Sequence, residues 1–112
     1  MTKTELIQKA ATHLGKEGYL VKTSPIMGID LLMCGNDHNL PIFVAVFDAS
    51  KVKSIPMNGF GYSQKAKEKA ERFVGAARKW IKTFIFGRIQ TRCDAVYVNG
   101  DVIFHGINVM KV

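Results

Sequence analysis

The sequence contains no uninterrupted run of about 18 apolar residues, the length that a membrane-spanning helix requires. Its first residues are polar and periodic, and they lack the charged stub followed by an apolar core that marks a signal peptide. Internal repeats, low-complexity segments and linkers are also absent. We therefore expect a cytoplasmic protein without a membrane partner, folded as one domain over residues 1–112.

Cysteine is scarce, since the chain contains only Cys34 and Cys93. Neither belongs to a Cys-x-x-Cys pair or has a Cys/His spacing typical of zinc sites. We interpret both as buried small apolar residues in a reducing compartment. The histidines, which are His13, His38 and His105, lack i, i+4 spacing, so we expect each to be a hydrogen-bonded polar side chain rather than a metal ligand.

Acidic residues are scarce in one part of the chain. Residues 51–92 contain 11 of the 16 Lys/Arg residues but only 2 of the 9 Asp/Glu residues, so this segment carries +9 while the remainder carries −2. Such a concentration creates a local positive potential that suits a phosphate backbone or another polyanion. A solvated, lysine-rich helix face is the alternative interpretation.

The N-terminal half shows helical spacing first and strand patterns afterwards. Thr2 and Glu5 have the spacing of a capping box, and the apolar residues that follow predict a helix ending near residues 15–18. Strands are predicted at residues 19–23, 29–33 and 42–47, with a polar turn over residues 35–39. The run at 42–47 is almost entirely apolar, which is typical of a central strand covered on both faces.

The C-terminal half begins with a long loop, predicted at residues 48–63. A second helix is predicted at 64–86, with an apolar stripe beside a basic one, and Asn99-Gly100 predicts a hairpin joining strands at 95–98 and 102–105. This order indicates an α/β fold with a mixed sheet of about five strands flanked by two main helices. We expect the strand after the second helix to return beside the central strand.

The chain also contains five segments whose order and spacing are informative: AATHLGKEGY, MGIDLLM, FVAVF, KAERFVGAARKWI and CDAVYVNGDVIFHGINVM. Together they resemble small bacterial predicted endonucleases of the YraN-like kind, which are relatives of archaeal Holliday-junction resolvases. The resemblance implies a restriction-endonuclease-like fold, phosphodiester hydrolysis assisted by a divalent metal such as Mg²⁺, and self-association as a homodimer. It covers nearly the whole chain, although no single segment is specific.

The catalytic residues that the resemblance implies are mostly missing. The family's aspartate corresponds to Asp30, but its glutamate corresponds to Ala45 and its lysine to Phe47. One carboxylate offers too few oxygen ligands to hold Mg²⁺. We therefore expect a degenerate active site that has lost hydrolysis and needs no cofactor.

A migrated active site is the alternative that keeps hydrolysis. Glu5 and Asp48 could join Asp30 in a rebuilt carboxylate cluster, and Lys51 or Lys53 could substitute for the missing lysine. Glu5 is already explained by the helix cap, and Asp48 by a turn at the start of the loop.

The sequence thus predicts a nuclease-like protein that binds nucleic acid, with duplex or branched DNA favoured over RNA. The residues expected to contact phosphates are Lys51, Lys53, Lys65, Lys69, Arg72 and Lys79. Phe60 and Tyr62 either stack on bases or pack their loop onto the domain. The alternatives are a pseudo-nuclease that serves as an adaptor for an acidic protein, and an active DNA endonuclease with a migrated site.

Overall fold

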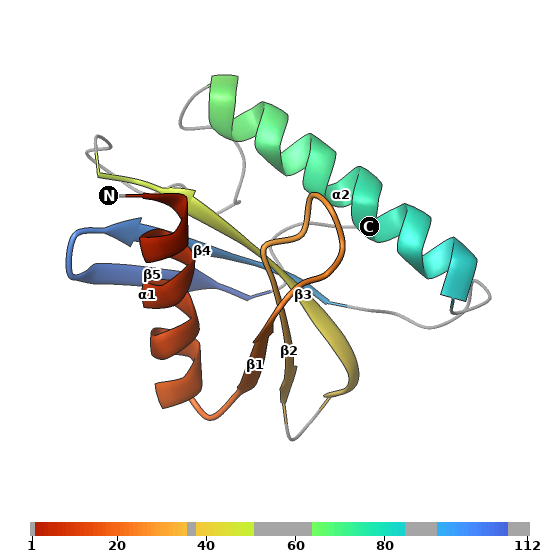
Figure 1. Ribbon diagram of the computed structural model, residues 1–112, viewed down its shortest axis with the longest axis horizontal. Coiled ribbons are helices and arrows are strands. Elements are labelled where there is room, and N and C mark those ends of the chain that lie inside the picture. Colours follow the sequence, from red (N-terminus) through yellow and green to blue (C-terminus); the bar gives the residue numbers. More distant parts are fainter. Residues whose placement is uncertain (1, 36–37, 51–63, 85–91, 108–112) are drawn as a thin grey trace.

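The computed structural model describes residues 2–35, 38–50, 64–84 and 92–107. Within these ranges the elements are α1 (Lys3–Lys16), β1 (Leu20–Thr23), β2 (Leu31–Gly35), β3 (His38–Asp48), α2 (Gln64–Phe84), β4 (Cys93–Asn99) and β5 (Val102–Gly106). They form one mixed sheet with two helices (Figure 1), which confirms the predicted α/β class. Neither of the helices described has the length and apolar character needed to cross a membrane.

The strand order in the sheet is β1-β2-β3-β4-β5. All neighbouring strands pair antiparallel except β3 and β4, which are parallel. A parallel pair needs a crossover connection, and α2 lies in the segment that makes it. The strand after the second helix therefore returns beside the central strand, as predicted.

Two predicted boundaries need correction or fall partly outside the described residues. The polar turn at 35–39 is shorter than predicted, because His38 already pairs with Gly35 and Asn39 belongs to β3. Both polar residues therefore belong to the strand and not to the turn. Most of the predicted loop, residues 51–63, lies outside the described residues, as do the last two positions of the predicted second helix.

Each helix covers one face of the sheet, and each face has its own core cluster. The α2 side of the sheet is covered by buried residues of that helix: Ala66, Ala70, Phe73 and Ala77. On the opposite side, Ala10 and Leu14 of α1 pack against apolar residues of β2, β3 and β4. Along β3, Phe43 belongs to the α2-side cluster and Val44 to the α1-side cluster. The strand is apolar on both faces because both are covered.

The two cysteines differ in exposure, so the prediction that both are buried is wrong for Cys34. Cys93 is fully buried, whereas Cys34 is exposed near the end of β2. Cys34 pairs with Leu20 of the edge strand, and that leucine is 79% exposed. A small apolar side chain at this edge of the sheet therefore stays in contact with water.

This difference predicts selective thiol modification. Burial, with a smaller contribution from the charge of Asp94, raises the pKa of the Cys93 thiol to about 12. We expect a disulfide reagent such as Ellman's to modify Cys34 alone in the native protein and both cysteines in denaturant, because it attacks accessible thiolates. The released chromophore gives the thiols per chain. A Cys34→Ser variant that still reacts rapidly when folded would contradict the expectation.

Candidate nucleic-acid interface and the Asp30 site

Asp30 lies in the loop between β1 and β2, immediately before β2, and is 9% exposed. Its Oδ2 accepts a hydrogen bond of 2.7 Å from the backbone N–H of Val46 in β3. Its own backbone N–H donates to the carbonyl oxygen of Val44 at 3.2 Å. These two bonds hold the carboxylate beside the strand from which the resembled family would supply its glutamate and lysine.

Lys69 reaches this carboxylate from α2. Its Nζ lies 2.9 Å from Asp30 Oδ2 and also donates a hydrogen bond to the carbonyl oxygen of Val46. The same ammonium lies 5.2 Å from the centre of the Phe47 ring, within the range of a cation–π contact. A lysine ammonium thus occupies the space next to Asp30 Oδ2.

The position of Lys69 differs from the exposed basic edge on which the sequence placed it. Its side chain is 30% exposed, because its residue borders the apolar stripe of α2 and its long stem can extend toward the sheet. The helical pattern shows which stripe a lysine occupies, but it does not show which way a four-carbon stem will point. The Lys69 side chain points toward the sheet because the Asp30 carboxylate lies there.

Ala45 and Phe47 fill the positions of the missing catalytic residues with apolar packing. Both are buried in the α2-side cluster, and Phe47 stacks on Tyr97 with ring centres 5.3 Å apart. Neither side chain can ligate a metal. Within the described ranges, the neighbourhood of Asp30 therefore offers one carboxylate, one ammonium and an aromatic ring, a set that does not fit a divalent cation.

The two carboxylates of the possible migrated site have other partners. The Thr2 hydroxyl oxygen accepts from the Glu5 backbone N–H at 3.2 Å and its hydroxyl donates to Glu5 Oε1 at 3.1 Å, so this pair caps α1. Asp48 Oδ1 accepts from the Ser50 backbone N–H at 3.0 Å, as in an Asx turn. Among the described residues, no group of three or more His, Cys, Asp or Glu side chains could hold a metal ion. The structure does not bring Glu5, Asp48 and Asp30 together.

The exposed side of α2 carries a row of cations. Lys65, Arg72 and Lys79, which we name the basic flank, are all exposed and seven residues apart. Seven residues make nearly two full turns, so the three side chains follow one line with a rise of about 10.5 Å between neighbours. Lys67, Arg78 and Lys82 are also exposed on this helix. Lys51, Lys53, Phe60 and Tyr62 lie outside the described residues.

The geometry defines a mixed α/β protein with an internally neutralised carboxylate and a basic helix on its surface. No protein-family model matches the sequence, and no curated protein matches it significantly.

A second charged cluster, which was not predicted from the sequence, lies on the α1 side of the sheet. Asp94 of β4 is fully buried. Its sequence neighbours Cys93 and Ala95 belong to the α2-side cluster, so Asp94 projects from the other face of the strand. Arg92 donates to both of its carboxylate oxygens, at 3.0 and 3.1 Å. His105 of β5 places Nε2 at 2.7 Å from Asp94 Oδ2, and its side chain is only 4% exposed. The signal in the sequence was a single charged residue inside an otherwise apolar strand.

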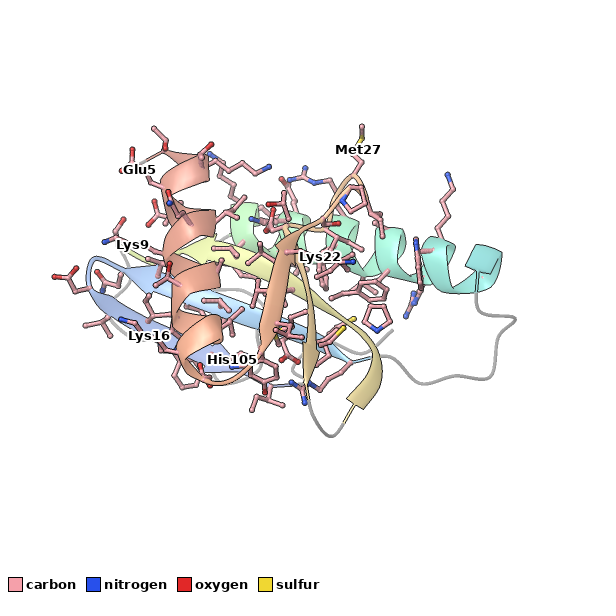
Figure 2. The ribbon with its side chains drawn as sticks, turned by 60° about the horizontal axis from the view of Figure 1, so that its bottom comes forward. Glu5, Lys9, Lys16, Lys22, Met27 and His105 are labelled. Carbon is pink, nitrogen blue, oxygen red and sulfur yellow. The ribbon has the colours of Figure 1, made fainter. Side chains whose placement is uncertain are left out.

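This cluster continues to the end of α1. The Arg92 guanidinium donates to the hydroxyl oxygen of Tyr19 at 3.0 Å. His105 Nδ1 lies 3.4 Å from one carboxylate oxygen of Glu17, and His13 Nε2 lies 2.7 Å from the other. Figure 2 shows His105 beside the C-terminal end of α1. The expectation that His13 and His105 are hydrogen-bonded polar side chains is confirmed, and the His38 side chain is outside the described part.

The cluster predicts a pH dependence of stability. Burial by itself would lower the pKa of His105, but the hydrogen bond and charge of Asp94, with smaller contributions from Glu17, raise it overall above 6.5. A raised folded-state pKa stabilises the fold fully below the unfolded pKa, and this contribution is lost as pH rises through the folded value. We therefore expect the free energy of unfolding, measured by urea titration, to decrease as pH rises from 6.5 through the raised pKa. The decrease should be smaller in His105→Gln, and an equal decrease in both proteins would contradict this assignment.

Proposed function

We propose that this protein binds nucleic acid through α2 and that it is a nuclease-like protein without metal-dependent hydrolysis. Its proposed ligand is duplex or branched DNA, and its proposed relatives are the YraN-like proteins of the restriction-endonuclease-like superfamily. The observation that carries the proposal is the basic flank, in which Lys65, Arg72 and Lys79 are exposed in one line.

The dimensions of the basic flank support binding to a phosphate backbone. From Lys65 to Lys79 the helix rises by about 21 Å, at 1.5 Å per residue. One DNA strand carries a phosphate every 3.4 Å along the axis, so this length corresponds to about six phosphates. The helix has seven Lys/Arg residues against two Glu residues. Its opposite face is packed on the sheet, so the cations are held on a rigid support.

The surroundings of Asp30 support the loss of hydrolysis. A metal nuclease needs several oxygen ligands around a cation that activates water. Here the Lys69 ammonium and the Val46 N–H both contact one oxygen of Asp30, the carboxylate that the resemblance identifies with the family's aspartate. A metal ion could approach that oxygen only if the ammonium left a buried carboxylate, and Ala45 and Phe47 offer no replacement ligand.

The test is a binding titration combined with a cleavage assay. We expect labelled duplex, branched and single-stranded DNA of equal length to be bound at about 50 mM salt, with affinity falling steeply as salt increases. No binding to any of them, with capture of an acidic protein instead, would favour the adaptor function.

Incubation of the protein with the same DNA and Mg²⁺ or Mn²⁺ should produce no cleavage. Cleavage that disappears in Asp30→Ala would show that the active site survives.

A further inference from the structure

The loop between β1 and β2 ends in a hydrogen-bonded turn. The Ile29 backbone N–H donates to the Ile26 carbonyl oxygen at 3.2 Å, and Gly28, the third residue of this turn, has φ of +90°. A positive φ at that position is typical of a type II turn, where glycine is favoured. The Ser24 hydroxyl oxygen accepts from the Ile26 N–H at 3.0 Å and holds the entry to the turn.

This turn fixes Met27 in an outward orientation. Its neighbours Ile26 and Ile29 both pack into the α2-side cluster, whereas Met27 is 93% exposed. Figure 2 shows its side chain projecting away from the body of the protein. Because Ile26 and Ile29 are anchored in the cluster, the Met27 backbone is held at the surface and its apolar side chain extends into water.

The turn lies against α2, the helix that carries the basic flank. A Cβ atom placed on Gly28 would lie 3.2 Å from the Ala76 Cβ and 3.7 Å from the Arg72 carbonyl oxygen, so the turn touches the middle of α2. Figure 1 shows this loop reaching the helix. Gly28, the residue that follows Met27, therefore contacts the turn of α2 that contains Arg72.

A cation from the sheet edge lies on the same side. Lys22 of β1 is exposed and pairs with Leu32, whose side chain belongs to the α2-side cluster. Paired residues of antiparallel strands project from the same face, so Lys22 also projects toward the α2 side. Three exposed residues are thus on this side of the sheet: Lys22 on its edge strand, Met27 on the turn that contacts α2, and Arg72 on α2 itself.

We propose that Met27 is an apolar wedge that enters the base stack of a bound duplex at an unpaired or mismatched base. This inference rests on the proposed function and adds a selectivity to it. Proteins that deform DNA commonly insert an apolar side chain, methionine among them, between base steps while cations hold the adjacent phosphates. Unstacking is least unfavourable where pairing is already interrupted. A bulged duplex should therefore bind more tightly than a continuous one.

The experiment compares a continuous duplex with the same duplex carrying one extra base, with 2-aminopurine next to that base. For the wild-type protein at about 50 mM salt, we expect a preference for the bulged duplex on the order of tenfold, with increased 2-aminopurine fluorescence on binding. Met27→Ala should lose the preference and the fluorescence increase while retaining its affinity for the continuous duplex. Val102→Ala is the matched control, because Val102 is also exposed, at 66%, but lies on β5.

The outcomes separate this inference from the function on which it rests. A wild-type protein that binds both duplexes equally would overturn the wedge while DNA binding stands. The wedge would also be overturned if Met27→Ala keeps the preference for the bulged duplex or weakens binding to both duplexes equally. If the wild-type protein binds neither duplex, the proposed function itself fails. Circular dichroism of each variant verifies the fold, and the high exposure of Met27 means that its replacement removes little packing.

Discussion

Replacing Asp94 by alanine is expected to lower the free energy of unfolding by about 3–5 kcal/mol, the range observed when one partner of a buried ion pair is removed. The carboxylate is fully buried and its two oxygens accept from Arg92 and contact His105. Without it, a mostly buried guanidinium and a nearly buried imidazole would lose their shared partner. The remaining hydrogen bond from Arg92 to Tyr19 cannot replace a charge.

Urea denaturation near pH 6 would measure this change, because there His105 is protonated and the pair is complete. Asp101→Ala is the matched control, since it removes the same group from a fully exposed position that forms only a 3.6 Å ion pair with Lys9. We expect the control to unfold almost as the wild type does. Equal effects of the two substitutions would mean that the cluster contributes nothing beyond a surface charge.

Neutralising the basic flank is expected to have the largest effect on DNA binding. In the triple variant Lys65→Ala/Arg72→Ala/Lys79→Ala, the slope of log affinity against log salt should decrease in magnitude by about 3, since each phosphate contact contributes about 0.9. Affinity at low salt should fall on the order of a hundredfold or more, and to similar extents for duplexes of different sequence, because phosphate contacts carry no sequence information.

A variant with the same loss of charge distinguishes a local interface from a general electrostatic attraction. Lys3→Ala/Lys9→Ala/Lys16→Ala removes three cations from α1, which packs on the opposite side of the sheet. We expect its salt slope to remain close to that of the wild-type protein. If both triple variants lose affinity equally, the net charge attracts DNA and α2 is not the interface.

Several features of the fold were predictable because each is determined by a short segment of the sequence. The Thr2 cap, the apolar run of β3 and the Asn99-Gly100 turn each depend on residues close in the sequence. The pairing of β4 beside β3 also followed, because a strand after a crossover helix has few places to return to. These are matters of local conformation and connectivity.

The candidate site was predicted less completely. Asp30 was identified as a carboxylate without catalytic companions, and the structure shows Ala45 and Phe47 packed in the core beside it. Its ion pair with Lys69 was not predicted, because the partner is on a helix 39 residues away in the chain. Helical periodicity assigned that lysine to an exposed edge and contained no information about a carboxylate on another element.

Residue spacing and composition were thus sufficient for the element types, the layered α/β architecture and the concentration of positive charge on the second helix. The partners of the charged side chains and the exposure of Cys34 followed from the packing of distant segments. The reason is physical: backbone preferences act over a few residues, whereas burial and ion pairing depend on which surfaces meet after the sheet has formed.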